Sequence, residues 1–160
     1  MKQNINITVL MLMAIPVIIT ISCRKEDAVQ DGKTKTVLLT SGSWKRTALT
    51  SNPAYDWNAD GTFATDNLSV MYPCEKDNFE TYHVNGIVET NEGPTKCDPS
   101  DPQTWSVPWR FAENETKLIW EFDNVADVYT LLELSATVLK FQSTFVENGV
   151  SYTQVETYGH

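Results

Sequence analysis

The 160-residue sequence is poor in basic residues, in histidine and in cysteine. It holds 12 lysines and arginines against 21 acidic residues, which gives a net charge of -9. This balance argues against nucleic acid as a partner, because binding to phosphates is driven by basic side chains that displace counterions. We interpret the acidic charge as a solvated exterior that keeps the protein soluble.

The two histidines and three cysteines leave little for catalysis or metal binding. His83 lies near the tip of a predicted hairpin and His160 is the last residue, so the sequence fixes no serine or cysteine nucleophile beside either. A structural zinc site normally needs four ligands. Carboxylate pairs of the glycosidase kind stay open, because abundant acidic residues allow many pairs and indicate none. We therefore predict no catalytic residue, metal site or cofactor.

One segment has half of a calcium-loop pattern. Residues 56–61 (DWNADG) place oxygen ligands at alternate positions and glycine at the sixth. The twelfth position, where a bidentate glutamate belongs, is Asn67, and no helix is predicted on either side. An Asp-Gly turn between two strands explains the same residues, and we adopt that interpretation.

The chain begins with a predicted secretory signal peptide. A lysine at position 2, a mostly apolar run over residues 5–21 and the small residue Ser22 match its three parts. The alternative, an uncleaved anchor helix, is disfavoured by Pro16 inside the run and by its polar ends, because a membrane span needs about 20 apolar residues. We place the signal peptide at residues 1–22 and a polar, flexible tether at residues 23–36.

The residues around Cys23 resemble the lipobox of bacterial lipoproteins. Thr20-Ile21-Ser22-Cys23 has a small residue before the cysteine, although threonine stands where leucine is usual. The resemblance implies that Cys23 is the lipid attachment site, that it carries two or more acyl chains such as palmitate, and that these anchor the protein in a membrane. Lys25-Glu26-Asp27 resembles an export tag for lipoproteins of the outer membrane, which implies a location on the cell surface.

Residues 74–97 are predicted to form a hairpin whose two ends are joined by a disulfide. Asn85-Gly86 is typical of a two-residue type I′ turn, and the flanking residues are rich in strand formers. This turn pairs residues whose numbers sum to 171, so it brings Cys74 opposite Cys97. Lipidation of Cys23 removes the odd cysteine, and an oxidising compartment favours a disulfide between the remaining two. Two reduced thiols, or half of a metal site, are the alternative.

From Val37 onward the pattern alternates with period two, without a convincing helical period. A first strand runs from Gly42 to about Thr50, and Asn148-Gly149 forms a second type I′ hairpin that places Phe145 opposite Tyr152. Three further rows share a face within one strand: residues 107, 109 and 111; residues 118, 120 and 122; and residues 128, 130, 132 and 134. We predict an all-β domain over residues 37–160, an antiparallel up-and-down barrel of about eight strands with one disulfide-stapled hairpin, because closure removes exposed edges.

The same region resembles the lipocalin-like domains of bacterial lipoproteins. The resemblance rests on Gly42-Ser43-Trp44 at the start of the first strand, on residues 58–63 and 74–78, on Cys97, and on leucines 134 and 139 around a turn. It covers roughly residues 37–158. The late arginine that packs on the first-strand tryptophan in animal lipocalins is missing. The resemblance implies a barrel that binds a small hydrophobic ligand.

Inward-facing aromatic residues are the candidate binding residues. They either line a cavity for a small hydrophobic or glycan-like ligand or fill the barrel completely. If the core is solid, the protein is instead a surface interaction module that binds an unknown protein through loops such as residues 98–103. The candidate ligand-binding residues are Trp44, Trp109, Phe111, Trp120, Phe122, Phe141 and Phe145.

Overall fold

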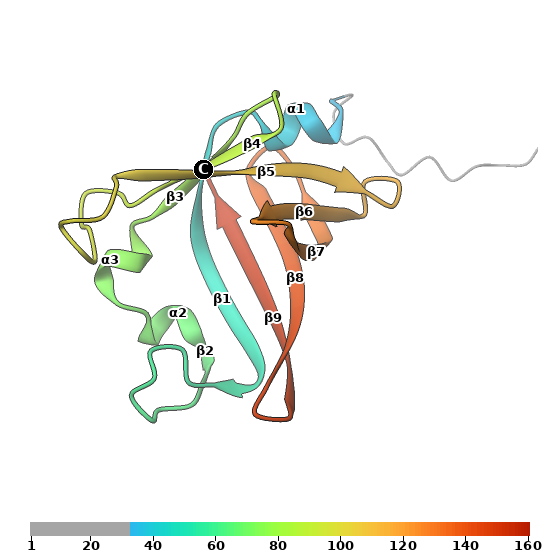
Figure 1. Ribbon diagram of the computed structural model, residues 1–160. Coiled ribbons are helices and arrows are strands. Elements are labelled where there is room, and N and C mark those ends of the chain that lie inside the picture. Colours follow the sequence, from blue (N-terminus) through green and yellow to red (C-terminus); the bar gives the residue numbers. More distant parts are fainter. Residues whose placement is uncertain (1–32) are drawn as a thin grey trace, which may run out of the picture.

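The structure is a computed structural model that describes residues 33–160 (Figure 1). The predicted signal peptide, Cys23 and most of the tether lie outside this range. In the described part no helix is long and apolar enough to cross a membrane. The helices are α1 (Lys35–Leu39), α2 (Asn67–Val70) and α3 (Pro73–Lys76), and the strands are β1 (Ser43–Tyr55), β2 (Ala64–Asp66), β3 (Phe79–Tyr82), β4 (Ile87–Asn91), β5 (Thr104–Ala112), β6 (Lys117–Phe122), β7 (Val125–Leu134), β8 (Val138–Glu147) and β9 (Val150–Gly159).

Eight strands close into an antiparallel up-and-down barrel, as predicted. From β3 to β9 each strand pairs with the next in sequence, and β1 pairs with β3 on one side and with β9 on the other. The closing pair runs from Lys45 opposite Gly159 to Asn52 opposite Thr153. The short β2 pairs with the far part of β1 and lies outside the closed ring. Closure gives each of the eight strands a neighbour on both sides, which removes most of the free edges that promote aggregation.

One end of the barrel is filled, and we call it the filled half. Its fully buried side chains include Trp44, Tyr82, Leu118 and Phe141. Helix α1 covers this end, where the indole N–H of Trp44 donates to the Leu39 carbonyl over 2.8 Å. The His160 ring lies 3.9 Å from the Trp44 ring, measured between centroids, and so covers the tryptophan. The sequence predicted none of the three helices, because each is too short to show a helical period.

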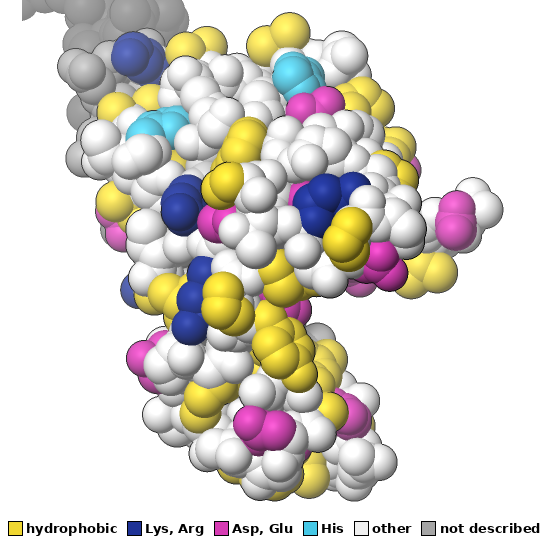
Figure 2. Space-filling model, turned by 90° about the vertical axis from the view of Figure 1, so that its left-hand side faces the viewer, with side chains coloured by type: hydrophobic (Ala, Val, Ile, Leu, Met, Phe, Trp, Pro, Cys, Tyr) yellow, Lys and Arg dark blue, Asp and Glu magenta, His cyan; other side chains and the backbone are white. Residues whose placement is uncertain are grey.

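The other end, the open half, is built from the far parts of β1, β8 and β9. These strands have 13, 10 and 10 residues, whereas β3, β4 and β6 have four, five and six. The long strands therefore continue past the short ones, as Figure 1 shows. Figure 2 shows a lower lobe joined to the larger body by a narrower region, with hydrophobic side chains at the junction. The first strand ends at Tyr55, five residues later than predicted.

The first hairpin turns differently from the prediction. Tyr82 pairs with Val88, so the paired residue numbers sum to 170, not 171. Asn85 does not have a positive φ, whereas Gly86 has φ +82°, and the Gly86 N–H donates to the His83 carbonyl. This is a three-residue loop with a type I turn and a glycine in the left-handed region. The one-residue change puts Tyr82 and Val88 inside together.

The second hairpin matches the prediction. Asn148 and Gly149 both have positive φ, +50° and +79°, as a type I′ turn requires. Phe145 lies opposite Tyr152, and their rings stack with centroids 5.2 Å apart.

The predicted row on β7 is wrong for Val128 and Leu132. Val128 and Leu132 are about half exposed, at 49% and 48%, and Tyr129 and Leu131 pack on the core instead. A register shift between Leu131 and Glu133 then returns Leu134 to the inside. The strand has apolar residues on both faces, so alternation alone does not tell which face is buried.

The predicted disulfide is present between Cys74 and Cys97, with Cα atoms 5.1 Å apart. Neither cysteine lies in a strand: Cys74 belongs to α3, and Cys97 to the loop after β4. The side-chain amide of Asn78 donates to the carbonyls of Cys74 and Glu92, which ties the two chain segments together before the ladder begins at Phe79. The disulfide therefore fixes the ends of the hairpin through loop residues, and its cysteines are not a cross-strand pair.

Candidate ligand-binding site in the barrel

The structure divides the candidate aromatic residues between the two halves. Trp44, Trp109 and Phe141 are at most 7% exposed and pack among other core side chains of the filled half. Phe111 lies beside Trp109, with ring centroids 5.4 Å apart. Because these rings fill the space they surround, they hold the barrel together and leave no room for a ligand between them. Trp120 belongs to the same buried cluster and Phe122 packs against it, whereas Phe145 lies in the open half and stacks on Tyr152.

Below the filled half, the inward positions are charged and polar. Arg46 Nε donates to Glu156 Oε2 over 2.8 Å, and Arg46 Nη2 donates to the Tyr158 hydroxyl over 3.0 Å. That hydroxyl also lies 2.7 Å from Glu156 Oε2 and 3.1 Å from Glu80 Oε1. The Tyr82 hydroxyl donates to the other oxygen of Glu80 over 3.2 Å. We call these residues the polar network.

Glu80 is the most unusual member of the network, because it is buried without a direct ion pair. Burial is the largest cause that raises its pKa, and the nearby Glu156 carboxylate adds to it; together they outweigh Arg46 and the tyrosine hydroxyls and bring the pKa to about 7. Tyr158 has a single hydroxyl proton for the two carboxylates that it contacts. A protonated Glu80 supplies the second proton and completes the set of hydrogen bonds.

An open recess of about 640 Å³ lies on the β7 and β8 side of the network. Trp57, Tyr129 and Phe145 give it aromatic surface, while most of its other side chains are polar. Gln154 lines the recess and is 8% exposed, and its buried Nε2 has no hydrogen-bond partner within residues 33–160. A buried amide N–H without a partner is costly, so this side chain gains a hydrogen bond if it turns toward a ligand in the recess. Its other polar lining residues include Lys117, Thr130, Gln142, Ser143 and Glu156.

A smaller inner chamber of about 180 Å³ lies on the β3, β4 and β5 side of the same network. Glu156 lines the recess and Arg46 lines the chamber, so their ion pair stands between the two cavities. The other residues that line the chamber are Asn78, Glu80, Thr90, Trp105, Trp120 and Tyr158.

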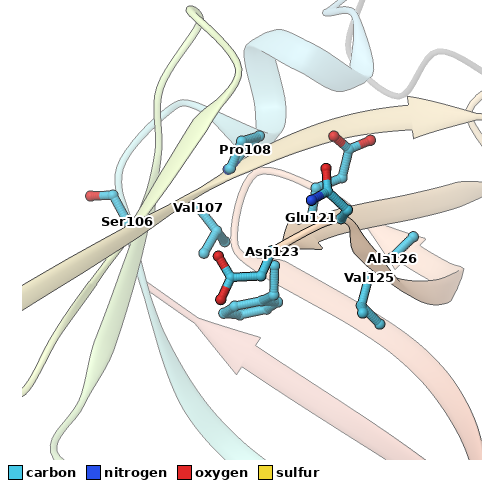
Figure 3. Close-up of a pocket in the computed structure, with 9 residues that line it drawn as sticks. Ser106, Val107, Pro108, Glu121, Asp123, Val125 and Ala126 are labelled. Atoms are coloured by element: carbon cyan, nitrogen blue, oxygen red, sulfur yellow. The ribbon is translucent and has the colours of Figure 1, made fainter.

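The barrel wall itself has a third hollow, the wall slot, of about 690 Å³. Strand β5 pairs with β6 only from Trp109 onward, and its earlier residues pair with β4 alone. Figure 3 shows residues 106–108 of β5 on one side of the slot and the β6–β7 turn on the other. Pro108 has no N–H to donate where the pairing stops. Phe122 lines the slot, and its ring lies 5.7 Å from that of Trp105, measured between centroids.

The sequence prediction missed the polar network and the recess. One signal was available for Arg46, which follows Trp44 by two positions and therefore shares its inward face. The same parity links Glu156 to Tyr158. Alternation of apolar residues alone predicts a solvated position for the charged residues in those rows. No pattern could have shown that β7, β8 and the loop carrying Trp57 meet at one hollow.

The residues of the possible calcium loop form a turn. Both oxygens of Asp56 accept backbone N–H groups, from Asp60 and Gly61, and Asp60 accepts that of Thr62. These hydrogen bonds within the turn explain why Asp56 and Asp60 stand at these two positions. Within residues 33–160 no three histidine, cysteine or acidic side chains are grouped to hold a metal ion.

Comparison with known proteins gives a structural similarity but no family. No protein-family model matches the chain, and no curated protein matches it. Among solved structures it is similar to bovine odorant binding protein in complex with a selenium-containing odorant, at 11% sequence identity and a TM-score of 0.43, over 81% of this chain and 74% of that chain. The class of protein is therefore defined by the strand pairing: a closed eight-stranded up-and-down barrel, as the resemblance to lipocalin-like domains implied.

Proposed function

We propose that this protein is a cell-envelope lipoprotein whose barrel binds a small glycan-like ligand in the recess. The observation that carries the proposal is a hollow with both aromatic and polar walls, beside the unpaired Gln154 amide. A ligand rich in hydroxyl groups pairs with the polar groups of the recess, and its apolar faces pack on Trp57, Tyr129 or Phe145. A fully hydrophobic ligand, the other class that the sequence allows, would leave these polar groups unpaired.

Binding of soluble oligosaccharides to the full-length protein tests this proposal. We expect at least one member of a panel of chito-, cello- and xylo-oligosaccharides to bind saturably in isothermal titration calorimetry, and Trp57→Ala and Gln154→Leu each to weaken that binding at least tenfold. Phe63→Ala is the matched control, because Phe63 is 64% exposed and lies outside the recess. The proposal fails if no oligosaccharide binds, or if the two recess variants bind as the wild type does. Saturable uptake of a hydrophobic dye alone would indicate the hydrophobic class.

A surface interaction module is the second candidate, and the wall slot favours it. Residues 104–108 lack a strand partner on the β6 side, and Val125 at the slot is 66% exposed. An extended segment of a partner protein could pair with such an edge. This candidate predicts that Val125→Asp abolishes capture of the partner while oligosaccharide binding is unchanged.

The envelope location rests on residues outside the described range. The apolar run before Ser22-Cys23 supports cleavage after residue 22, acylation of Cys23 and a tether over residues 23–36, and Lys25-Glu26-Asp27 supports export to the outer face of the outer membrane. Labelling with a palmitate analogue in a bacterial host tests the anchor. We expect Cys23→Ala to lose the label and Ser22→Ala, which keeps a small residue before the cut, to retain it. A Cys23→Ala protein that still takes label would refute the anchor.

A further inference from the structure

We propose that the inner chamber is a second binding site, which takes one neutral hydroxylated ring such as a single sugar unit. The inference rests on the proposed function in one respect, the glycan-like class of ligand. It concerns a different cavity, because the chamber and the recess share no lining residue.

One buried polar atom of the chamber lacks a partner. Thr90 is 6% exposed, and its Oγ1 has no hydrogen bond to any described residue. Trp120 is equally buried, and its indole N–H has the Tyr82 hydroxyl as a neighbour. Both Thr90 and Trp120 line the chamber. Arg46 adds a spare donor: its Nε and Nη2 are taken by Glu156 and Tyr158, whereas Nη1 has only the sulfur of Met71 at 3.9 Å. Buried polar groups are nearly always paired, so this set calls for a polar occupant.

The charges around the chamber select a neutral occupant. An anion near Arg46 would also face the carboxylates of Glu80 and Glu156, and a cation near Glu80 would also face Arg46. Hydroxyl groups match the arrangement better, because each one both donates and accepts. They can accept from Arg46 Nη1 while donating to Glu80, and they can exchange hydrogen bonds with Thr90 in either direction.

The shape of the chamber limits the occupant to about one ring. Its volume is about 180 Å³, less than a third of the volume of the recess. Trp105 lies opposite Thr90 on the neighbouring strand and contributes an aromatic wall, with Trp120 beside it. The indoles supply apolar surface for the C–H face of a sugar ring, while the polar atoms form hydrogen bonds with its hydroxyl groups. Trp105 is 39% exposed, so it stands at the entrance.

Titration of the full-length, ¹⁵N-labelled protein with simple methyl glycosides tests the inference. The probes are the methyl β-glycosides of glucose, galactose and N-acetylglucosamine, and the signal is the Trp120 indole N–H resonance, assigned with Trp120→Phe. We expect at least one glycoside to shift this resonance saturably. Thr90→Val should weaken that binding at least tenfold, because it removes the hydroxyl and keeps the shape. Thr153→Val, on the outward face of β9, should change it less than twofold.

Two results overturn the inference: no glycoside shifts the Trp120 resonance, or Thr90→Val binds as tightly as the wild type. The first means that the chamber holds water only. Gln154→Leu separates this inference from the proposed function. If Gln154→Leu abolishes oligosaccharide binding and Thr90→Val leaves all sugar binding intact, the recess function stands and the chamber inference fails. If Thr90→Val abolishes monosaccharide binding and Gln154→Leu leaves oligosaccharide binding intact, the chamber stands and the proposed role of the recess fails.

Discussion

The filled half and the open half share strands β1, β8 and β9 but differ in what their inward positions hold. Leu139 and Phe141 point into the filled half from β8, and Ser143 and Phe145 continue the same row into the open half. On β9 the row changes from Tyr158 to Glu156 and Gln154. Apolar rings that pack on all sides stabilise the barrel, whereas polar groups that face a hollow stabilise it less and remain available to a ligand. One continuous sheet can therefore serve both as core and as binding wall.

Truncation of a ring in each half should show this difference with the largest effect. Phe141 is 1% exposed, so Phe141→Ala should lower the free energy of unfolding by about 3–5 kcal/mol. Phe145→Ala should lower it by about half as much, because Phe145 is only partly buried. Urea unfolding measures both, with Val146→Ala as the control, since Val146 is 71% exposed. Equal losses for the two phenylalanines would contradict the division into halves.

Removal of the disulfide should have the next largest effect. The Cys74–Cys97 bond has a sequence separation of 23, and the chain-entropy relation gives a loss of about 3.5 kcal/mol for the Cys74→Ala/Cys97→Ala double variant. Urea unfolding measures the loss. Thiol titration of the denatured, unreduced wild type should find neither cysteine free. A free thiol at either position would show that the bond does not form.

The pH dependence of stability should report on the polar network between the halves. Glu80 has a pKa of about 7 in the folded state against 4.5 as its ordinary value. The folded protein then holds this proton more tightly than the unfolded chain, so its contribution is fully present below pH 4.5 and is lost as the pH rises through 7. The loss amounts to about 3 kcal/mol.

Glu80→Gln should remove most of this dependence, since glutamine stays neutral. Glu133→Gln, at an exposed position on β7, is the control and should retain it. Urea unfolding between pH 4.5 and 8 provides the measurement. Wild-type stability that stays level or rises over this range would show that Glu80 is ionised in the folded protein.

A glycine at the tip of the open half should give the smallest effect. Gly149 has φ +79° and no atom within 4 Å of an added Cβ, so Gly149→Ala should cost only backbone strain, about 1 kcal/mol. Gly93 has φ +68°, and a Cβ there would lie 2.5 Å from the Asp77 carbonyl oxygen. Gly93→Ala should therefore cost clearly more. Similar melting temperatures for the two variants would contradict this comparison.

The two Asn-Gly turns show how far local sequence rules reach. Asn148-Gly149 forms the predicted type I′ turn because its hairpin projects freely from the barrel. At Asn85-Gly86 the Gly86 carbonyl accepts the Trp109 N–H over 2.7 Å, and the His83 carbonyl accepts the Trp109 indole N–H over 3.2 Å. Strand β5, which carries Trp109, thus takes part in setting the conformation of the loop. A dipeptide rule describes a hairpin alone and cannot include such a contact.

By itself the sequence determined that this is an all-β chain, that it closes into a barrel and that Cys74 pairs with Cys97, because alternation, turn residues and cysteine number act over short distances along the chain. Only the tertiary structure decided which face of β7 is buried, where the first hairpin turns, and that Arg46, Glu80, Glu156 and Tyr158 meet inside the barrel. These features depend on a register shift and on contacts between strands more than 70 residues apart, such as that between Glu80 and Tyr158 with a separation of 78. Contacts at such separations leave no periodic pattern in the sequence. They place the polar network where the filled half ends and the cavities begin.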